Sequence, residues 1–389
     1  MIVRRALVLI AAALLVAIVV RNAAVMMLAQ SSPAEAAGIW RTHPAAEISL
    51  AMTEIARAAR DRRPIPPSAF AMVGDAATKD PLAPEPFLVR GVQAQLAGNG
   101  ALAERAFEAA QWRDPRSLPA AYFLADHYVR EGDIGRGLSQ IAALARLSPN
   151  GATTAGPYIA AFAANSANWP VLRKVFKRNP ELAGPALNAL ASNIATVPAV
   201  LALADSNAKP SQAQWLAPLL ATLTEAGQYA KARAIWAKAS GARIDEPIHD
   251  ARFTDKVAPP PFNWSLTSSA VGLAERQPGG RLHILFYGQE DGILATQLLL
   301  LKPGPYRLTM QLIGDRARAR SLNWSIWCDK APAPIASVTL EAAASRGWSF
   351  NVPAGCPAQW LKLSGSSGDI SQQVDETIGG LKLERMAGA

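Results

Sequence analysis

The pattern of hydrophobic and polar positions changes character twice along the chain. Residues 6–29 are apolar except for Arg21 and Asn22. From residue 44 to about residue 250, apolar residues recur every three to four positions, which is the period of amphipathic helices. After the sequence KVAPPPFNW (256–264), alternation and Gly-Pro or Gly-Gly turns replace that period and predict β-strands. We therefore expect an apolar helix, a helical region and a β region, in that order.

The N-terminal apolar segment follows Arg4 and Arg5 and is long enough to cross a membrane. Its uninterrupted part covers about 22 Å as a helix, whereas the whole segment matches the roughly 30 Å hydrocarbon core. The positive flank predicts a cytoplasmic N-terminus. The alternative is a cleaved signal peptide, because residues 34–36 match the A-x-A pattern. Both readings export the rest of the chain. We favour a single-pass anchor over residues 1–30 in the inner (cytoplasmic) membrane, with the bulk of the chain in the periplasm.

The helical region contains an internal repeat. A helical linker region (31–82), with a helix predicted at 44–60, precedes it. Small and large packing residues then recur about 34 residues apart: Phe87, Gly91, Ala103, Phe107, Ala110 and Pro115, followed by Ala121, Ala125, Gly137, Ile141, Leu144 and Pro149. This spacing resembles the tetratricopeptide repeat, a pair of antiparallel helices. The resemblance implies a helical solenoid over 83–250 whose concave surface binds a protein partner of the envelope.

The C-terminal region, residues 257–389, predicts an all-β sandwich or jelly roll. Short alternating segments separated by turns are typical of such folds. The expected strands lie at 282–287, 294–301, 304–314, 321–328, 335–341, 347–352, 358–364 and 378–385.

The chain has only two cysteines, Cys328 and Cys356, and both lie in this β region. In an oxidising compartment they form one disulfide; the alternative is two buried free thiols. The four histidines are isolated in the sequence, and neither cysteine has a second ligand at metal spacing. We expect no metal site and no cofactor.

Charge and motifs argue against two large functional classes. The net charge of +9 is spread along the chain without a basic run, so we expect no nucleic-acid partner. No nucleophile elbow, phosphate-binding glycine loop or H-E-x-x-H motif is present. The carboxylate pairs Glu290–Asp291 and Asp375–Glu376 are expected to be solvated turn residues. We expect a non-enzymatic protein; the alternative is a polysaccharide-modifying enzyme with an unrecognised site in the β-sandwich.

Aromatic content and strand pattern suggest a ligand class for the β region. The region resembles carbohydrate-binding jelly rolls in length, alternation and aromatic residues. The stretches LNWSIWC and FNVPAGCPAQWLKLSG are similar to the C-terminal domain of membrane-anchored repeat proteins of the Gram-negative envelope. That resemblance implies a scaffold that acts beside envelope or exopolysaccharide assembly and export, with a polysaccharide as a further partner.

Alternation along the strands sorts the candidate residues. In 322–328, Trp324 and Cys328 share the apolar face, and Trp327 lies on the polar face. In 358–364, Trp360 and Lys362 point outward. Flat aromatic side chains stack on pyranose rings. Trp327, Trp360 and Lys362, joined by Tyr287, are therefore the glycan candidates. The alternative is that the helical repeats cover this face and the aromatic residues form that interface.

Overall fold

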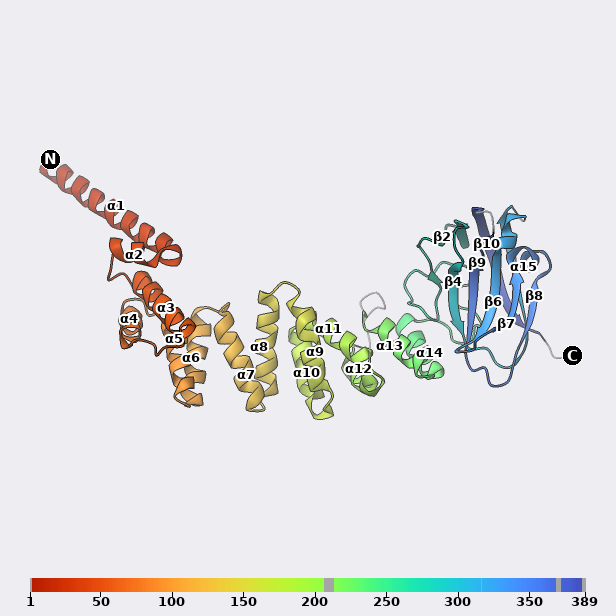
Figure 1. The fold of residues 1–389 in the computed structure, drawn as a ribbon, viewed down its shortest axis with the longest axis horizontal. Helices are drawn as coiled ribbons and strands as arrows, with labels where there is room; N and C mark the ends of the chain where they lie inside the picture. Colours follow the sequence, from red (N-terminus) through yellow and green to blue (C-terminus); the bar gives the residue numbers. More distant parts are fainter. Residues whose placement is uncertain (1, 206–212, 316, 369–371, 387–389) are drawn as a thin grey trace. The chain divides into compact units, whose positions relative to one another are not determined.

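The computed structural model describes residues 2–205, 213–315, 317–368 and 372–386. It has an N-terminal apolar helix, a helical region and then two antiparallel sheets (Figure 1). This is the fold class that the sequence predicts. The chain divides into two compact units, Met1–Ala152 and Thr153–Ala389.

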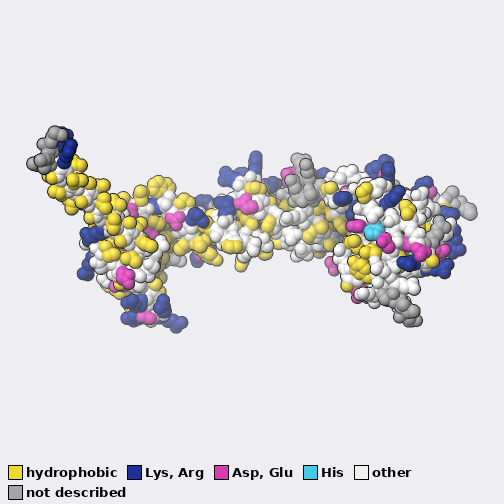
Figure 2. Space-filling model, turned by 90° about the horizontal axis from the view of Figure 1, so that it is seen from above, with side chains coloured by type: hydrophobic (Ala, Val, Ile, Leu, Met, Phe, Trp, Pro, Cys, Tyr) yellow, Lys and Arg dark blue, Asp and Glu magenta, His cyan; other side chains and the backbone are white. Residues whose placement is uncertain are grey.

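The first unit is entirely helical. Its helices are α1 (Ile2–Ser31), α2 (Pro33–Ile39), α3 (Pro44–Arg60), α4 (Pro67–Lys79), α5 (Glu85–Leu96), α6 (Gly100–Arg113), α7 (Leu118–Arg130) and α8 (Ile134–Leu147). Proline opens α2, α3 and α4, where its missing N–H has no helical partner to lose. The stretch Arg4–Ser31 of α1, with a mean hydropathy of 2.5, is long and apolar enough to cross a membrane. Hydrophobic side chains cover it (Figure 2), and it fits a membrane anchor and a signal sequence alike.

The hairpins α5–α6 and α7–α8 repeat the same local chemistry. Gly98 and Gly132 have positive φ angles and end the first helix of each hairpin. The next residues, Asn99 and Asp133, cap α6 and α8 by accepting hydrogen bonds from backbone N–H groups. These turns lie 34 residues apart, like the packing residues. The 34-residue spacing seen in the sequence therefore recurs in the turns of these two hairpins.

A glycine sets the distance between α5 and α6. A Cβ atom at Gly91 would lie 2.7 Å from Cε2 of Phe107, so only glycine leaves room for that ring. Phe107 is buried and stacks on Phe123 of α7 with a centroid distance of 4.0 Å. The ring of Phe107 thus joins the two hairpins.

The second unit begins with shorter and less regular helices. They are α9 (Gly151–Ala163), α10 (Trp169–Arg178), α11 (Pro180–Ala191), α12 (Val197–Leu203), α13 (Leu216–Glu225) and α14 (Tyr229–Ser240). Single 3-10 turns precede α10 and α12, and their N-caps are Asn165 and Asn193. Proline stands in the first turn of both helices, where its missing N–H costs no hydrogen bond.

The sandwich consists of two five-stranded antiparallel sheets. Its strands are β1 (Ser265–Leu266), β2 (Gly272–Gln277), β3 (Arg281–Phe286), β4 (Gly292–Leu299), β5 (Gly304–Gly314), β6 (Leu322–Cys328), β7 (Pro334–Thr339), β8 (Trp348–Val352), β9 (Gln359–Gly365) and β10 (Val374–Arg385). One sheet has the order β1-β4-β9-β6-β7 and the other β2-β3-β10-β5-β8. From β3 to β10 this is the strand order of a jelly roll.

Two strands and one α-helix of the described part of the sandwich are missing from the sequence prediction. They are the edge strands β1 and β2 and the short helix α15 (Leu340–Arg346). The predicted strand 335–341 ends at Thr339, whose hydroxyl caps α15 by accepting from Ala342 N–H. The edge strands are short or carry charged residues, which weakens the alternation that identifies a strand.

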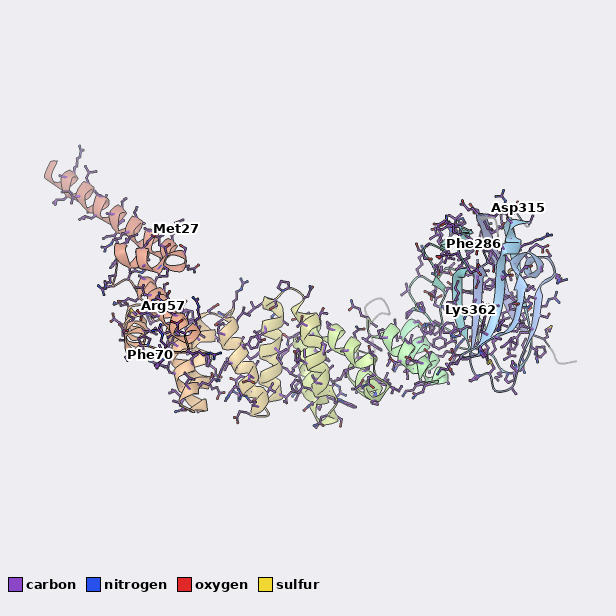
Figure 3. All side chains as sticks on the ribbon, in the orientation of Figure 1. Met27, Arg57, Phe70, Phe286, Asp315 and Lys362 are labelled. Carbon is purple, nitrogen blue, oxygen red and sulfur yellow. A yellow bond between two sulfur atoms is a disulfide. The ribbon has the colours of Figure 1, made fainter. Side chains whose placement is uncertain are left out.

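The two sheets meet closely at one glycine. Phe286, labelled within the sandwich in Figure 3, stands at the end of β3 and is fully buried. Its ring lies against Gly365 of the other sheet. A Cβ atom at Gly365 would lie 2.3 Å from Cε2 of Phe286. The core therefore depends on a bare backbone at this position.

The segment between α14 and β1 belongs to the sandwich core. Ile248, Phe253 and Trp264 are all buried in that core. Gln297 of β4, also buried, accepts a hydrogen bond from His249 N–H and donates one to the His249 carbonyl. This segment therefore closes one end of the sandwich instead of forming a free linker.

The same segment also packs on the last helix. The indole N–H of Trp236 in α14 donates to the Pro259 carbonyl at 2.8 Å. The fully buried Trp236 ring lies edge-on to His249 and tilted against Phe262. These contacts join the α13–α14 hairpin to the sandwich through a shared apolar layer.

Candidate functional site: a cleft beside Trp360

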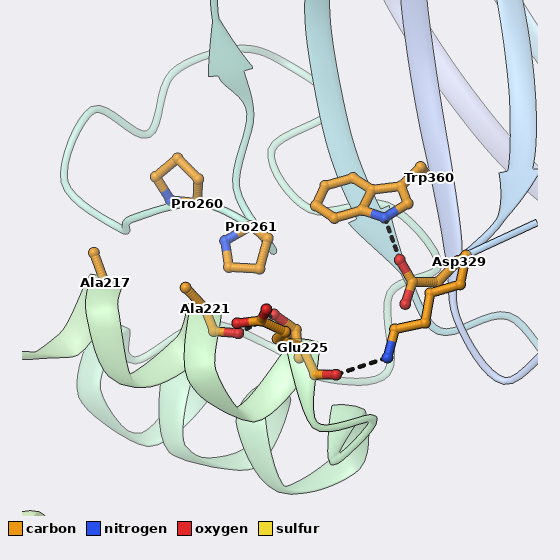
Figure 4. A pocket seen from close by; sticks show the side chains of 9 residues that line it. Ala217, Ala221, Glu225, Pro260, Pro261, Asp329 and Trp360 are labelled. Atoms are coloured by element: carbon orange, nitrogen blue, oxygen red, sulfur yellow. Dashed lines mark hydrogen bonds between the residues drawn. The ribbon is translucent and has the colours of Figure 1, made fainter. Parts of the chain in front are cut away.

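A cleft of about 510 Å³ lies between α13 and the sandwich (Figure 4). Three parts of the second unit line it: α13, the Pro260–Pro261 turn, and the ends of β6 and β9. The lining residues are Ala217, Ala221, Thr224, Glu225, Pro260, Pro261, Asp329, Lys330 and Trp360. A volume of this size is in the range of small-molecule sites, which hold roughly 300–1,000 Å³.

Asp329 fixes the indole of Trp360 on one wall of the cleft. Its Oδ1 accepts the Trp360 Nε1–H at 2.8 Å, and its Oδ2 accepts the Tyr229 hydroxyl at 2.5 Å. Burial, and next the hydrogen bond to Asp329, raise the pKa of Tyr229 to about 12. Tyr229 is therefore a neutral donor at physiological pH, and both carboxylate oxygens of Asp329 are engaged.

Lys330, the residue after Asp329, also lines the cleft. Its ammonium group donates to the Glu225 carbonyl at 2.7 Å (Figure 4). Glu225 is the last residue of α13, where free backbone carbonyls favour a cation. The lysine thereby ties the sandwich to the end of the helix, and it is one of the residues that line the cleft.

A disulfide positions this wall. Cys328 and Cys356 are bonded, with 5.6 Å between their Cα atoms, and this confirms the predicted pairing. Asp329 follows Cys328 directly, and the segment after Cys356 leads into β9, which carries Trp360. The covalent link therefore holds the donor and the acceptor of the Trp360–Asp329 hydrogen bond near each other.

The polar face of β6 and β9 continues away from the cleft. Trp327 lies opposite Trp360 in the strand register, and Lys362 lies opposite Ser325. The Lys362 ammonium is 4.7 Å from the centre of the Trp327 ring, and the Trp327 Nε1–H donates to Ser325 Oγ at 2.9 Å. Burial lowers the pKa of Lys362. The structure thus brings Trp327, Trp360 and Lys362 onto one face.

Tyr287 does not join this group. It follows β3, which belongs to the other sheet. The expectation that it lies with the two tryptophans is wrong, because alternation within a strand does not reveal which sheet the strand joins. Trp324, in contrast, is fully buried in the core as predicted.

Of the two acidic pairs, Glu290–Asp291 is exposed between β3 and β4, as expected, whereas Asp375–Glu376 is not a solvated turn. Glu376 lies inside β10 and points into the sandwich, where it is almost fully buried. Burial, and next the charge of Asp315, raise the pKa of Glu376 to about 7. Its neighbour Asp375 is exposed and accepts from His283 Nε2 at 2.9 Å. Asp291 accepts two hydrogen bonds from Ser367.

The sequence did not reveal the helical wall of the cleft. Asp329 and Lys330 stand next to a cysteine in a turn, and nothing in the sequence pairs them with Tyr229 and Glu225, about a hundred residues earlier. Trp360 lines the cleft opposite residues of α13. Within the described residues, no group of three His, Cys, Asp or Glu side chains is arranged to hold a metal ion.

Comparisons with known proteins add little to this picture. No protein-family model matches the chain, and no curated protein matches it. Among solved structures, a chain in the crystal structure of accessory secretory protein 1,2 and 3 in Streptococcus pneumoniae is similar over 31% of this chain and 90% of its own length. The identity is 12% and the TM-score is 0.24. A TM-score this low does not establish a shared fold.

Proposed function

We propose that the protein is a non-enzymatic, membrane-anchored scaffold of the periplasm that binds a glycan in the cleft beside Trp360. Its helical hairpins recruit an envelope protein, and the two activities together serve polysaccharide assembly or export. The observation that carries the proposal is the indole of Trp360, held by Asp329 at the wall of the cleft.

The chemistry of the cleft suits a sugar. The Nε1–H of Trp360 is already bonded, so its orientation is set before a ligand arrives and less ordering is required on binding. Ala217 and Ala221 on the opposite helix have short side chains that leave room for a ring. Thr224, Glu225 and Lys330 line the same space and offer hydrogen-bonding groups to hydroxyls.

Exposed apolar side chains on the first helix of each hairpin support the recruitment of a protein. Val92 and Leu96 of α5 are 43% and 78% exposed, and Tyr122 of α7 is 70% exposed. Apolar groups gathered on a soluble surface commonly mark contact sites for another protein. This half of the proposal is tested by crosslinking and pull-down from native membranes with wild-type protein and a Leu96→Ser, Tyr122→Ser variant. Equal recovery of partners by both proteins would contradict it.

The glycan proposal is tested with the full chain in detergent or nanodiscs on a glycan array. We expect Trp360→Ala to weaken binding of the selected glycan about tenfold or more, because the variant loses the buried apolar area of the ring and, in addition, a stacking contribution of about 0.5–1.5 kcal/mol. Trp327→Ala tests the neighbouring ring. The matched control is Trp112→Ala, which removes a tryptophan that is 73% exposed on α6. Absence of glycan binding, or binding unchanged by both Trp360→Ala and Trp327→Ala, would sink the proposal.

One observation favours the enzyme alternative enough to test it. Glu225 and Asp329 both line the cleft, and glycoside hydrolysis uses two carboxyl groups. The two hydrogen bonds that Asp329 accepts favour a positioning role for it instead. Product analysis after incubation with the selected glycan decides between a glycan-cleaving enzyme and a scaffold. Cleavage that is lost in Glu225→Gln would establish the enzyme, whereas an intact glycan supports the scaffold.

A further inference from the structure

The outer end of α1 is built into the folded protein. Val25 and Ala29 are buried against Ala36 of α2 and Ala46 of α3, and together they form one small apolar cluster. On the other side of α1, Met27 is 82% exposed (Figure 3). The last third of α1 therefore has one face against protein, whereas residues 4–20 are exposed.

Arg21 and Asn22, which interrupt the apolar segment, both have partners in the corner where α2 ends and α3 begins (residues 39–43). The Arg21 guanidinium donates to the Ile39 carbonyl from Nε at 3.1 Å and from Nη2 at 2.8 Å. It also lies 4.5 Å from the centre of the Trp40 ring. The corner thus supplies both a hydrogen-bond acceptor and an aromatic face for this charge.

Asn22 is held by His43. The His43 Nδ1 accepts from Ala45 N–H and caps α3, so its other ring nitrogen, Nε2, carries the proton and donates to Asn22 Oδ1 at 2.8 Å. Burial lowers the pKa of His43, which favours this neutral form. Trp40 and His43 meet edge to face at 5.2 Å. Trp40, His43, Arg21 and Asn22 are therefore one connected set.

The depth of this set follows from helix geometry. A span that starts at residue 6 needs about 20 residues to cross the hydrocarbon core and ends near Val25. Arg21 then lies about 6 Å inside the outer boundary, at 1.5 Å per residue. Ile39 and Trp40 lie at the level that the Arg21 guanidinium reaches, because that group contacts both directly. A long arginine side chain can carry its charge several ångströms toward the headgroups.

We propose that α1 is retained in the mature protein and that the corner Ile39–Trp40–Arg41 lies in the headgroup layer of the bilayer. Tryptophan and arginine are residues that prefer this layer, and Ile39 is an apolar residue that is 37% exposed. The lipid surface thereby orients the first helices of the protein in addition to anchoring them.

The buried position of Ala36 supports retention. The A-x-A pattern at 34–36 lies within α2, and Ala36 has no exposed surface. Proteolytic sites lie preferentially in exposed, irregular segments. Cleavage there would also remove Arg21, Asn22, Val25 and Ala29, and with them the partners of Trp40 and His43.

Retention is tested on the full chain, expressed in a bacterial host with a C-terminal tag and purified from membranes. Intact-mass spectrometry should give the mass of a chain that still contains α1. A mass that corresponds to a chain beginning after residue 36 would overturn the proposal.

The position of the corner is tested by fluorescence quenching in nanodiscs of phosphatidylcholine brominated near the headgroup end of its acyl chains. Because α1 contains no tryptophan, quenching near this end of α1 is expected to come from the indole of Trp40. We expect brominated lipid to reduce the emission of the wild type, and we expect that reduction to disappear in Trp40→Phe. Trp112→Phe, which replaces an exposed tryptophan on α6, should keep it. Quenching that survives in Trp40→Phe, or that is absent from the wild type, would place the corner outside the bilayer and overturn the proposal.

Discussion

The hairpin α5–α6 and the sandwich both depend on a glycine that admits a phenylalanine ring, but over very different lengths of chain. Gly91 and Phe107 lie in consecutive helices. Phe286 and Gly365 lie in different sheets and are separated by most of the β strands. In the hairpin the partner is one helix away, so a fixed spacing specifies the contact. In the sandwich the partner is specified only by the complete strand order.

The largest effect is expected from breaking the distant pair. Gly365→Val places a side chain 2.3 Å from the buried Phe286 ring, so the two sheets have to separate there. We expect a loss of about 3 kcal/mol in unfolding free energy, at the upper end of overpacking effects. Denaturant unfolding followed by near-UV circular dichroism measures it.

Gly379→Ala is the matched control within β10. The nearest atom to its added Cβ is Arg281 Cγ at 3.6 Å, an ordinary contact distance. Equal losses of unfolding free energy in Gly365→Val and Gly379→Ala would show that the sandwich tolerates crowding at Gly365. The contrast drawn between the sandwich and the hairpin would then be wrong.

A smaller and local effect is expected in the hairpin. Gly91→Ala places a Cβ atom 2.7 Å from Phe107, but alanine also favours the helix. We expect a net loss of about 1–2 kcal/mol, limited to neighbouring helices because each hairpin contacts only its neighbours. Hydrogen exchange should rise in α5–α7 and stay unchanged in the sandwich. Gly74→Ala, with nothing within 4 Å of its Cβ, is expected to gain up to about 1 kcal/mol.

The smallest effect concerns a polar contact across three strands. His283 of β3 bonds to Glu275 of β2 and Asp375 of β10. Burial alone would lower the pKa of His283, but the hydrogen bonds to the two carboxylates outweigh it and raise this pKa. The protonated histidine therefore stabilises the fold below about pH 6.5, and this contribution is lost as pH rises through the raised value.

His283→Gln should remove this contribution. Because both carboxylates are half exposed or more, we expect only about 0.5 kcal/mol near pH 5.5 and no difference near pH 9. Denaturant unfolding at the two pH values measures it, and Asp375→Asn should show a loss of the same sign. A difference between His283→Gln and wild type that is the same at both pH values would mean that protonation is not its cause.

The contrast between contacts within neighbouring elements and contacts between distant ones also explains which features could be predicted from the sequence. The helix Pro44–Arg60 and the alternation of Trp324 and Trp327 depend on neighbouring residues, and both were predicted correctly. The sheet joined by Tyr287, the role of Ile248 and Phe253 in the sandwich core, and the position of α13 beside Trp360 depend on residues far apart in the chain. One sequence contains no direct signal for such pairings, because many partners satisfy the same alternation.

Half of the candidate site was therefore predictable. The outward direction of Trp360 and Lys362 follows from the pleat of β9. The residues that turn this face into a cleft, Asp329 and Glu225, are identified only when the helix and the sheet are both in place.

The position of β10 has a consequence for how the protein is made. This strand pairs with β3 on one side and β5 on the other, and it is the last strand of the described chain. A chain that emerges N-terminus first can complete its helical hairpins one after another, since each needs only the next helix. β3 and β5 are synthesised before β10, the strand that lies between them in the sheet. At synthesis rates of about 5–20 residues per second, the interval before β10 is complete is several seconds. An interrupted chain that lacks β10 therefore displays two open strand edges, a state that proteases and chaperones can distinguish from the finished protein.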